Sequence, residues 1–594
     1  MRFVWAVAAF VLAALMIGAG IAQRTIFEGP KSESQAIEVA SDAPYVLIDG
    51  SVLTSHDGSQ NLRVQGDGTI FAAYGRTADI KAWLARADYT EVGVDAGSIT
   101  SASIAAAEPP AAGQAPLNPV GSDLWLDEFQ QEDVLITPLQ LPADMSLLVA
   151  SDGVEPAPHS LSLTWPVRSS TPWAGPLIVG GSILLVVGLV LYILGVRHAR
   201  RSRGPRRKGV PLAVTEPIDL AVDGADKGVI SASPPRRRLT RGRQASLAVP
   251  LVAVGVLLIT GCSPDAWPQP AASPTPSSSQ SVVVPDDQGS PVVTEAQAER
   301  IVARIADTVA TADEARDATS AATRLAGTAL AVRETNYTLR GAIADQAALP
   351  PIPDGNLQVT LPEANDEWPR TFFAVAAGSS DGGTDQPDVI LSVSQQDPWS
   401  PYKLTSLATL TSDTELNLAP AYVGAIPIPA DSPFLTVAPD DLAAAYADVL
   451  TKGAGSEYAA SFDMADDALQ KQLDANRTQR LNDFNQTGAQ TGSLTFAASA
   501  GTQPPAALAT LDSGAIVAVT VDDLDTVVPT NADAVIKVDG NPIVQTLTGV
   551  AQSSTGFTTT YANQLFFFVP SQSSKERVSL LGYSSNILQS KVVG

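Results

Sequence analysis

The residue with the clearest chemical potential is Cys262, the only cysteine in the 594-residue chain. A cysteine thiolate is a strong nucleophile. Cys262 follows an uncharged run from Gln244 to Gly261, and an arginine-rich segment, residues 236–243, precedes that run. Thr260 and Gly261 are small, so a peptidase could approach the extended backbone beside the cysteine. A basic segment, a short apolar segment and small residues at its end are typical of an export signal.

The end of this run, Ile259-Thr260-Gly261-Cys262, resembles the lipobox of bacterial lipoproteins. The resemblance implies that a diacylglyceryl group alkylates the sulfur of Cys262 and that a peptidase cleaves the chain before it. Two acyl chains anchor a protein stably, whereas one gives only marginal binding. The signal departs from the family pattern because it lies inside the chain. The alternative is a third transmembrane helix that ends in a free cysteine.

Charge is distributed unevenly along the chain, and the distribution predicts a membrane topology. The formal net charge is −25; residues 23–175 contribute about −13 and residues 262–594 about −22, whereas residues 197–243 contribute about +9. Basic residues collect on the cytoplasmic side of membranes. We therefore expect residues 197–243 to be a disordered cytoplasmic loop, and residues 23–175 and 263–594 to be extracytoplasmic. Acidic domains repel phosphate, so we expect no nucleic-acid partner.

Three apolar segments would carry the chain through the membrane. We expect residues 1–22 to be a transmembrane helix or signal anchor, in preference to a cleaved signal peptide, and residues 176–196 to be a second transmembrane helix. Residues 244–262 are short for a permanent span, which favours an export segment. Residues 263–293 are rich in proline and serine and predict a tether.

Residues 23–175 predict a β-rich, sandwich-like exported domain, because short strand-like runs alternate with turn residues. The pair Asp67-Gly68 inside the alternating run 62–71 predicts a hairpin. Residues 77–87 predict a short helix, since their apolar residues share one helical face. Leu124-Trp125-Leu126 predicts a strand.

The remaining residues predict an α+β exported region. A capping box at Thr294 opens a long amphipathic helix that extends to about Arg340, either unbroken or broken near Gly327, and strand-like runs follow. The same order then recurs, so we expect one module at 294–430 and a second at 431–594. A helix followed by a curled antiparallel sheet, twice, resembles tandem cystatin-like domains, the class that includes nuclear transport factor-like folds. A single larger α+β domain is the alternative.

The whole arrangement resembles an uncharacterised group of actinobacterial membrane-anchored envelope proteins. The motifs that carry the resemblance are Tyr74-Gly75-Arg76-Thr77-Ala78-Asp79-Ile80-Lys81-Ala82-Trp83-Leu84, Gly121-Ser122-Asp123-Leu124-Trp125, Ser151-Asp152-Gly153, Leu163-Thr164-Trp165-Pro166, Arg333-Glu334-Thr335-Asn336-Tyr337 and Trp399-Ser400-Pro401-Tyr402-Lys403. The resemblance implies a location in the envelope and no particular reaction.

Few other residues suggest chemistry. The three histidines, His56, His159 and His198, all precede the C-terminal region, so that region holds no histidine-based triad or metal site. The acidic runs 381–385 and 522–525 could bind calcium through oxygen ligands, although solvated loops are the commoner outcome. Four tryptophans could line a carbohydrate groove but more often pack in a core, namely Trp125, Trp165, Trp368 and Trp399. We therefore expect no metal, no cofactor and no catalytic residues.

The sequence thus predicts a multi-domain, membrane-anchored envelope protein. We expect it to display exported binding or assembly modules without enzymatic activity, with membrane lipid and an unidentified envelope protein as partners. One alternative is a cell-wall enzyme that acts through carboxylates. Another is a solute-binding or transporter-associated lipoprotein with a closed cleft between its two C-terminal modules.

Overall fold

The structure is a computed structural model that describes residues 2–27, 32–166, 172–201 and 291–594. Short gaps lie inside those ranges at residues 40, 57, 110–114, 356, 379, 382–383, 386, 412–418 and 512. The chain divides into two compact units. One unit contains residues 1–28 and 171–284, and the other contains residues 29–170 and 285–594.

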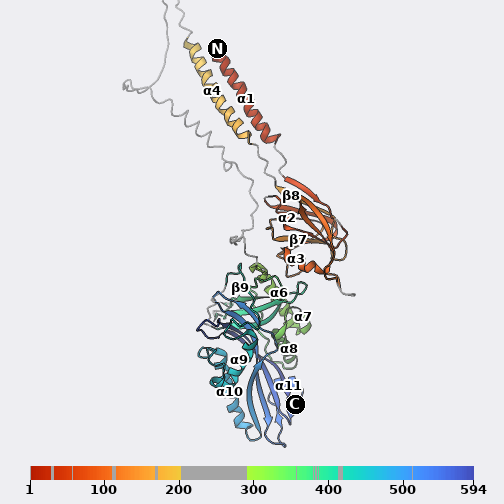
Figure 1. Ribbon diagram of the computed structural model, residues 1–594, viewed down its shortest axis with the longest axis vertical. Coiled ribbons are helices and arrows are strands. Elements are labelled where there is room, and N and C mark those ends of the chain that lie inside the picture. The colour runs from red at the N-terminus through yellow and green to blue at the C-terminus, as the bar shows by residue number, and fades with distance from the viewer. Residues whose placement is uncertain are drawn as a thin grey trace, which may run out of the picture. The chain divides into compact units, whose positions relative to one another are not determined.

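The first unit contains two apolar helices that lie side by side, α1 (Arg2–Thr25) and α4 (Ala174–Arg201) (Figure 1). Residues Phe3–Thr25 and Ala174–Arg200 are long and apolar enough to cross a membrane. The predicted helices at 1–22 and 176–196 are therefore confirmed as candidate spans. The apolar segment 244–262 and the flanking predictions at 197–243 and 263–290 lie almost entirely outside the described residues.

Glycines bring α1 and α4 into close contact. A Cβ atom added at Gly181 would lie 2.6 Å from Ile17 Cγ1 and 3.0 Å from the Ala13 carbonyl oxygen, and one added at Gly20 would lie 2.6 Å from Ile178 Cγ1. Small residues let membrane helices approach closely enough for van der Waals packing. The two helices therefore have the contact surface of a pair rather than of two independent anchors.

Replacing Gly181 by leucine is expected to separate this helix pair, because the side chain would collide with backbone and side-chain atoms of α1. Overpacking of this kind costs about 1–3 kcal/mol. We expect a lower melting temperature of the detergent-solubilised chain. Gly18→Leu is the matched control, since a Cβ atom at Gly18 meets nothing within 4 Å. Equal effects of the two substitutions would contradict the packing argument.

The N-terminal part of the second unit is all-β, as predicted. Its strands are β1 (Ser32–Ile37), β2 (Tyr45–Ile48), β3 (Gln60–Arg76), β4 (Tyr89–Asp95), β5 (Ser98–Ile104), β6 (Asp127–Leu139), β7 (Met145–Ala150) and β8 (Ser160–Pro166), with helices α2 (Gly50–Leu53) and α3 (Thr77–Trp83). The strands form one sheet in the order β1-β8-β3-β7-β2-β4-β5, and β6 pairs with β3. We expected the two separate sheets of a sandwich; one continuous sheet with an apolar cluster on each face replaces them.

The predicted hairpin at residues 62–71 is wrong, because β3 continues through Asp67-Gly68 as one long strand. The register with β6 shifts between Gln65 and Thr69, so the extra residues form a bulge. Gly68 adopts a φ of +79°, and its amide donates to Asp133 Oδ1 across the bulge. The glycine signal was therefore correct about the backbone angle and wrong about the change of direction.

The C-terminal region has the predicted order of helices and strands, twice. The first round contains α6 (Glu295–Ala315), α7 (Ala318–Arg324), α8 (Gly327–Ala342), β9 (Leu357–Pro362), β10 (Arg370–Ala376), the short pair β11 (Ser380–Asp381) and β12 (Thr384–Asp385), β13 (Val389–Gln395) and β14 (Lys403–Leu410). The second contains α9 (Pro439–Lys452), α10 (Ala468–Thr487), β15 (Gly492–Ala500), β16 (Ala506–Ala509), β17 (Ala515–Pro529), β18 (Ile536–Lys537), α11 (Pro542–Thr548), β19 (Gln552–Ser553), β20 (Phe557–Val569) and β21 (Ser579–Val592).

Strands of both rounds join into one antiparallel sheet in the order β15-β17-β20-β21-β14-β13-β10-β9. Helices α6 to α8 cover one face of the first round, and α9 and α10 cover one face of the second. The opposite faces of the two rounds share a third apolar cluster, in which Phe373 packs edge-on against Phe566 at 5.7 Å. The predicted modules 294–430 and 431–594 therefore share a sheet and a core.

The long helix predicted from Thr294 to Arg340 is three helices: the break expected near Gly327 is confirmed, and a further break at Arg316 was not predicted. The capping box at Thr294 and Gln297 is confirmed. Arg316 adopts a left-handed conformation that ends α6, and Asp317 then accepts hydrogen bonds from two backbone amides and starts α7. This break lets α7 turn its C-terminal residue, Arg324, toward the contact described next.

Candidate functional site at the interdomain interface

The β-rich domain contacts the C-terminal region through residues 119–126, which we call the docking loop. The indole nitrogen of Trp125 donates to the Pro119 carbonyl at 2.6 Å and closes the loop. Gly121 adopts a φ of +76°, and its amide donates to Glu128 Oε2. The strand predicted at Leu124 to Leu126 is wrong, since these residues form turns before β6 begins.

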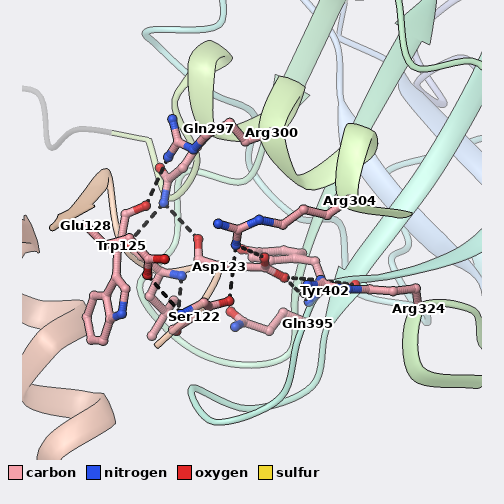
Figure 2. Close-up of polar contacts among 12 residues, drawn as sticks. Ser122, Asp123, Trp125, Glu128, Gln297, Arg300, Arg304, Arg324, Gln395 and Tyr402 are labelled. Carbon is pink, nitrogen blue, oxygen red and sulfur yellow. Dashed lines mark hydrogen bonds and ion pairs between the residues drawn. The ribbon is translucent and has the colours of Figure 1, made fainter. Parts of the chain in front are cut away.

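The backbone carbonyls of the docking loop accept hydrogen bonds from one face of α6 (Figure 2). The donors are Arg304 to Gly121, Gln297 to both Asp123 and Leu124, and Arg300 to Trp125, at distances of 3.0 to 3.1 Å. The donors lie three, four and seven positions apart in α6, so one helical face presents them all. The loop uses these carbonyls as a strand would, but its partner is a helix.

The carboxylate of Asp123 is the centre of the contact. Its Oδ1 lies 3.1 Å from Arg304 Nη1 and its Oδ2 lies 2.5 Å from Arg324 Nη1. The backbone amide of Tyr402 also donates to Oδ2, at 2.9 Å. The Asp123 side chain is 0% exposed, and that of Arg324 is 14% exposed. We call the residues that bind the docking loop, including the Asp123 carboxylate, the arginine socket: Gln297, Arg300, Arg304, Arg324 and Tyr402.

Gln297 links the start of α6 to the socket. Its Oε1 accepts from the Thr294 amide within the capping box, while its Nε2 donates to the docking loop. Gln297 therefore helps to cap the start of α6 and also binds the other domain. Arg324 is fixed in a similar way, because its Nη1 also donates to the Tyr402 carbonyl at 3.3 Å.

A second contact is aromatic. The indole nitrogen of Trp399 donates to the Trp83 carbonyl at 2.8 Å, and the Arg86 guanidinium lies 3.3 Å above the Trp399 ring. Trp83 in turn packs edge-on against Trp125 of the docking loop at 5.4 Å. Trp368 and Trp399 both pack against the apolar cluster of the β-rich domain. Packing is therefore the role of these tryptophans, and Trp125 and Trp165 are buried as well.

A third contact is a buried ion pair between Asp79 and Arg370, whose Oδ1 and Nη1 lie 2.8 Å apart. Both side chains are almost completely buried. Arg370 stacks on the Trp368 ring at 3.6 Å. Burial raises the pKa of Asp79 above its usual range, although Arg370 and Arg76 act in the opposite direction. Arg76 also pairs with Asp366 of the C-terminal region.

Glu363 lies in the same buried polar layer. Burial raises the pKa of Glu363 to about 7, against the lowering effects of a hydrogen bond from the Thr371 backbone and of Arg370. The hydroxyl of Tyr402 is fully buried, and Arg370, Asp79, Glu363 and Asp123 all influence its pKa, which burial raises. Tyr402, a residue of the socket, is therefore influenced electrostatically by Glu363, whose pKa is about 7.

The folded state binds a proton at Glu363 more tightly than the unfolded chain does. Its contribution is absent below the ordinary pKa of 4.5, lowers stability as pH rises toward 7, and is constant above that. Glu363→Gln is therefore expected to stabilise the protein at pH 8, by on the order of 3 kcal/mol, and little at pH 4.5. Thermal unfolding at both pH values measures this, with exposed Glu367→Gln as the control. A gain at pH 4.5 as large as that at pH 8 would contradict it.

The predicted lipobox residues Ile259, Thr260, Gly261 and Cys262 lie outside the described residues. The two histidines of the β-rich domain lie beside different acidic residues: His56 lies near Glu33, and His159 lies near Asp42.

Two carboxylates of the acidic run 522–525 form ion pairs with arginines of α10. Asp523 pairs with Arg477, and Asp525 pairs with Arg480. The run 381–385 is described only in part. Within the described ranges no group of three or more histidine, cysteine, aspartate or glutamate side chains could hold a metal ion.

The sequence did not predict that the motifs at 74–84, 121–125 and 399–403 lie close together. The structure places all three at one interface. The usable signal was a carboxylate followed directly by leucine and tryptophan, at Asp123. A charged residue among apolar neighbours is usually paired when it is buried, but the sequence does not say with which arginine.

A family model described as a domain of unknown function (DUF8094) matches residues 289–591, about half of the chain. Comparisons with curated proteins and with solved structures found no match. The matched residues include the whole arginine socket and exclude the docking loop. The chain therefore belongs to the family defined by this domain of unknown function (DUF8094).

Proposed function

We propose that the chain is a membrane-anchored envelope protein that displays its two acidic domains outside the cell as one non-enzymatic binding or assembly unit. The observation that carries the proposal is the burial of Asp123 of the β-rich domain in the arginine socket of the family domain. Domains that share a buried ion pair must lie on the same side of a membrane.

This contact has a consequence for topology. If α1 and α4 both cross the membrane, the β-rich domain between them lies on the opposite side from Arg201 and the basic residues after it. The family domain could then reach the docking loop only if the chain crosses again before residue 291. Between residues 202 and 290 the sequence has one long apolar run, 244–261. The positive charge of residues 197–243 favours the cytoplasm for that side.

The third crossing agrees with the lipobox at 259–262. A crossing that ends in an acylated Cys262 would hold the family domain at the outer surface by its own lipid. Alkylation forms a bond between the cysteine sulfur and a glyceryl carbon of a phospholipid, and the phosphate headgroup leaves with the electron pair. Cleavage hydrolyses the Gly261–Cys262 amide with water. Each exported domain would then have its own anchor.

The polar residues of the second unit support an assembly role over catalysis. Asp79, Asp123 and Arg370 form ion pairs at the contact between the two domains. The junction of the two rounds of the family domain is filled by the apolar cluster around Phe373 and Phe566, which does not favour the solute-binding alternative with a closed cleft. The tryptophans that could have lined a glycan groove pack against the domain core.

Crosslinking in intact cells, followed by purification of the tagged full chain from membranes, tests the proposal. An assembly module is expected to bring one envelope protein in near-stoichiometric amount, absent from purification with the tag alone. Recovery of the chain without any stoichiometric partner would contradict the proposal. Hydrolysis of purified cell wall by the purified chain would contradict it in favour of an enzyme.

A further inference from the structure

We propose that the docking loop and the arginine socket form an interface between separable polypeptides. The family domain would hold the β-rich domain by noncovalent contacts centred on this interface, when no covalent link joins them. The proposal deepens the proposed function, because cleavage before Cys262 would leave the two domains on different chains.

The contacts themselves do not depend on the connecting segment. The polar bonds between the docking loop and the socket join residues 121–125 to residues 297–402, and Arg304 and Asp123 are 181 positions apart in the sequence. The aromatic contact joins Trp399 to Trp83 over 316 positions. None of these partners lies in residues 167–290, so cutting the chain there removes none of these contacts.

The boundary of the family supports separability. The matched residues begin at 289, after both apolar helices and after the β-rich domain. A family unit that starts there carries Gln297, Arg300, Arg304 and Arg324 but cannot supply Asp123 itself. The socket is therefore built to receive a loop from outside the family domain.

The chemistry defines what the socket accepts. Gln297, Arg300 and Arg304 donate hydrogen bonds to a row of backbone carbonyls of the loop. These bonds select the shape of the loop and not the identity of its side chains. Two guanidinium groups and one backbone amide read a single carboxylate at its centre. The partner is thus a protein loop that presents a central aspartate between exposed carbonyls, with a tryptophan surface beside it. Arg–carboxylate pairs of this kind give specificity as well as energy.

The test uses the full chain with a recognition site for a specific protease inserted into residues 263–284 and an affinity tag at the N-terminus. The chain is solubilised in detergent, bound through the tag, cut and washed. We expect the C-terminal fragment to stay bound. With Asp123→Ala we expect its dissociation constant to rise at least about a hundred-fold, because a buried carboxylate lost from two arginines leaves them unpaired, and the fragment should wash away.

Controls separate the interface from the fold. Asp448→Ala removes a carboxylate that pairs with Lys452 and Ser456 inside the family domain, and we expect this fragment to be retained. Arg324→Gln alters the socket from the other side and should also release the fragment. Circular dichroism of the released fragment verifies that it is folded.

Release of a folded, unsubstituted C-terminal fragment would overturn the proposal, and so would equal retention of the Asp123→Ala and unsubstituted fragments. The result is independent of natural processing, because the cut is engineered. A retained fragment in a protein that cells never cleave would leave this interface standing while the lipid-anchor part of the proposed function failed.

Discussion

Replacing Asp123 by asparagine in the intact chain is expected to uncouple the unfolding of the two exported domains. The carboxylate faces Arg304 and Arg324 with its side chain fully buried, and an amide cannot balance their charges. Breaking a buried pair by removing one partner costs about 3–5 kcal/mol. Most of this cost comes from the uncompensated guanidinium groups. The substitution keeps the size of the side chain, so the packing of Trp125 should be unchanged.

Calorimetry of the solubilised chain measures the effect. We expect the parent protein to melt with the two domains coupled, and the Asp123→Asn protein to melt at a lower temperature in two separated transitions. Asp448→Asn is the matched control, because Asp448 pairs with Lys452 on the surface of α9 and takes no part in the interface. Indistinguishable traces for the parent and Asp123→Asn proteins would show that the ion pair does not couple the domains.

Replacing Cys262 by alanine is expected to abolish processing of the chain completely. The acylated sulfur is the feature that the lipoprotein peptidase recognises in proteins with a lipobox, and alanine offers no nucleophile for acylation. An immunoblot against the C-terminus should show a species near the mass of residues 262–594 in the parent strain. The same blot should show only full-length protein with Cys262→Ala.

Ser263→Ala provides the control for this blot, because it changes the neighbouring residue and leaves Ile259 to Cys262 intact. We expect its fragment to match that of the parent. Full-length protein alone in all three strains would refute processing. It would leave the third apolar run as a plain transmembrane helix.

Local patterns in the sequence predicted most elements of the fold. The strand-like runs expected after the first helix are present as strands such as β10 and β13, and the capping box placed the start of α6 at the correct residue. These patterns report which face of a segment is apolar, which is a local property. They failed where the backbone bends without changing partners, as at Gly68, and where a short polar residue restarts a helix, as at Asp317.

The interface could not be predicted from the same patterns. Asp123 and Arg324 are brought together by the packing of two domains, and no periodicity links positions so far apart in the sequence. The docking loop also resembled a strand, because Leu124, Trp125 and Leu126 are apolar. Their backbone groups are satisfied by α6 and by β3 instead of by a strand on either side. Charge patterning predicts that both domains lie outside the cell, and this stays a prediction that the labelling experiment below tests.

Labelling of engineered cysteines with a membrane-impermeant maleimide tests the central claim most directly. Ser98→Cys lies at the exposed first residue of β5 in the β-rich domain, and Ala532→Cys lies in an exposed turn of the family domain. Ser231→Cys lies in the basic segment. We predict that intact spheroplasts label the first two above the parent background and label Ser231→Cys only after permeabilisation. Labelling of Ala532→Cys only after permeabilisation would place the family domain in the cytosol and contradict the account.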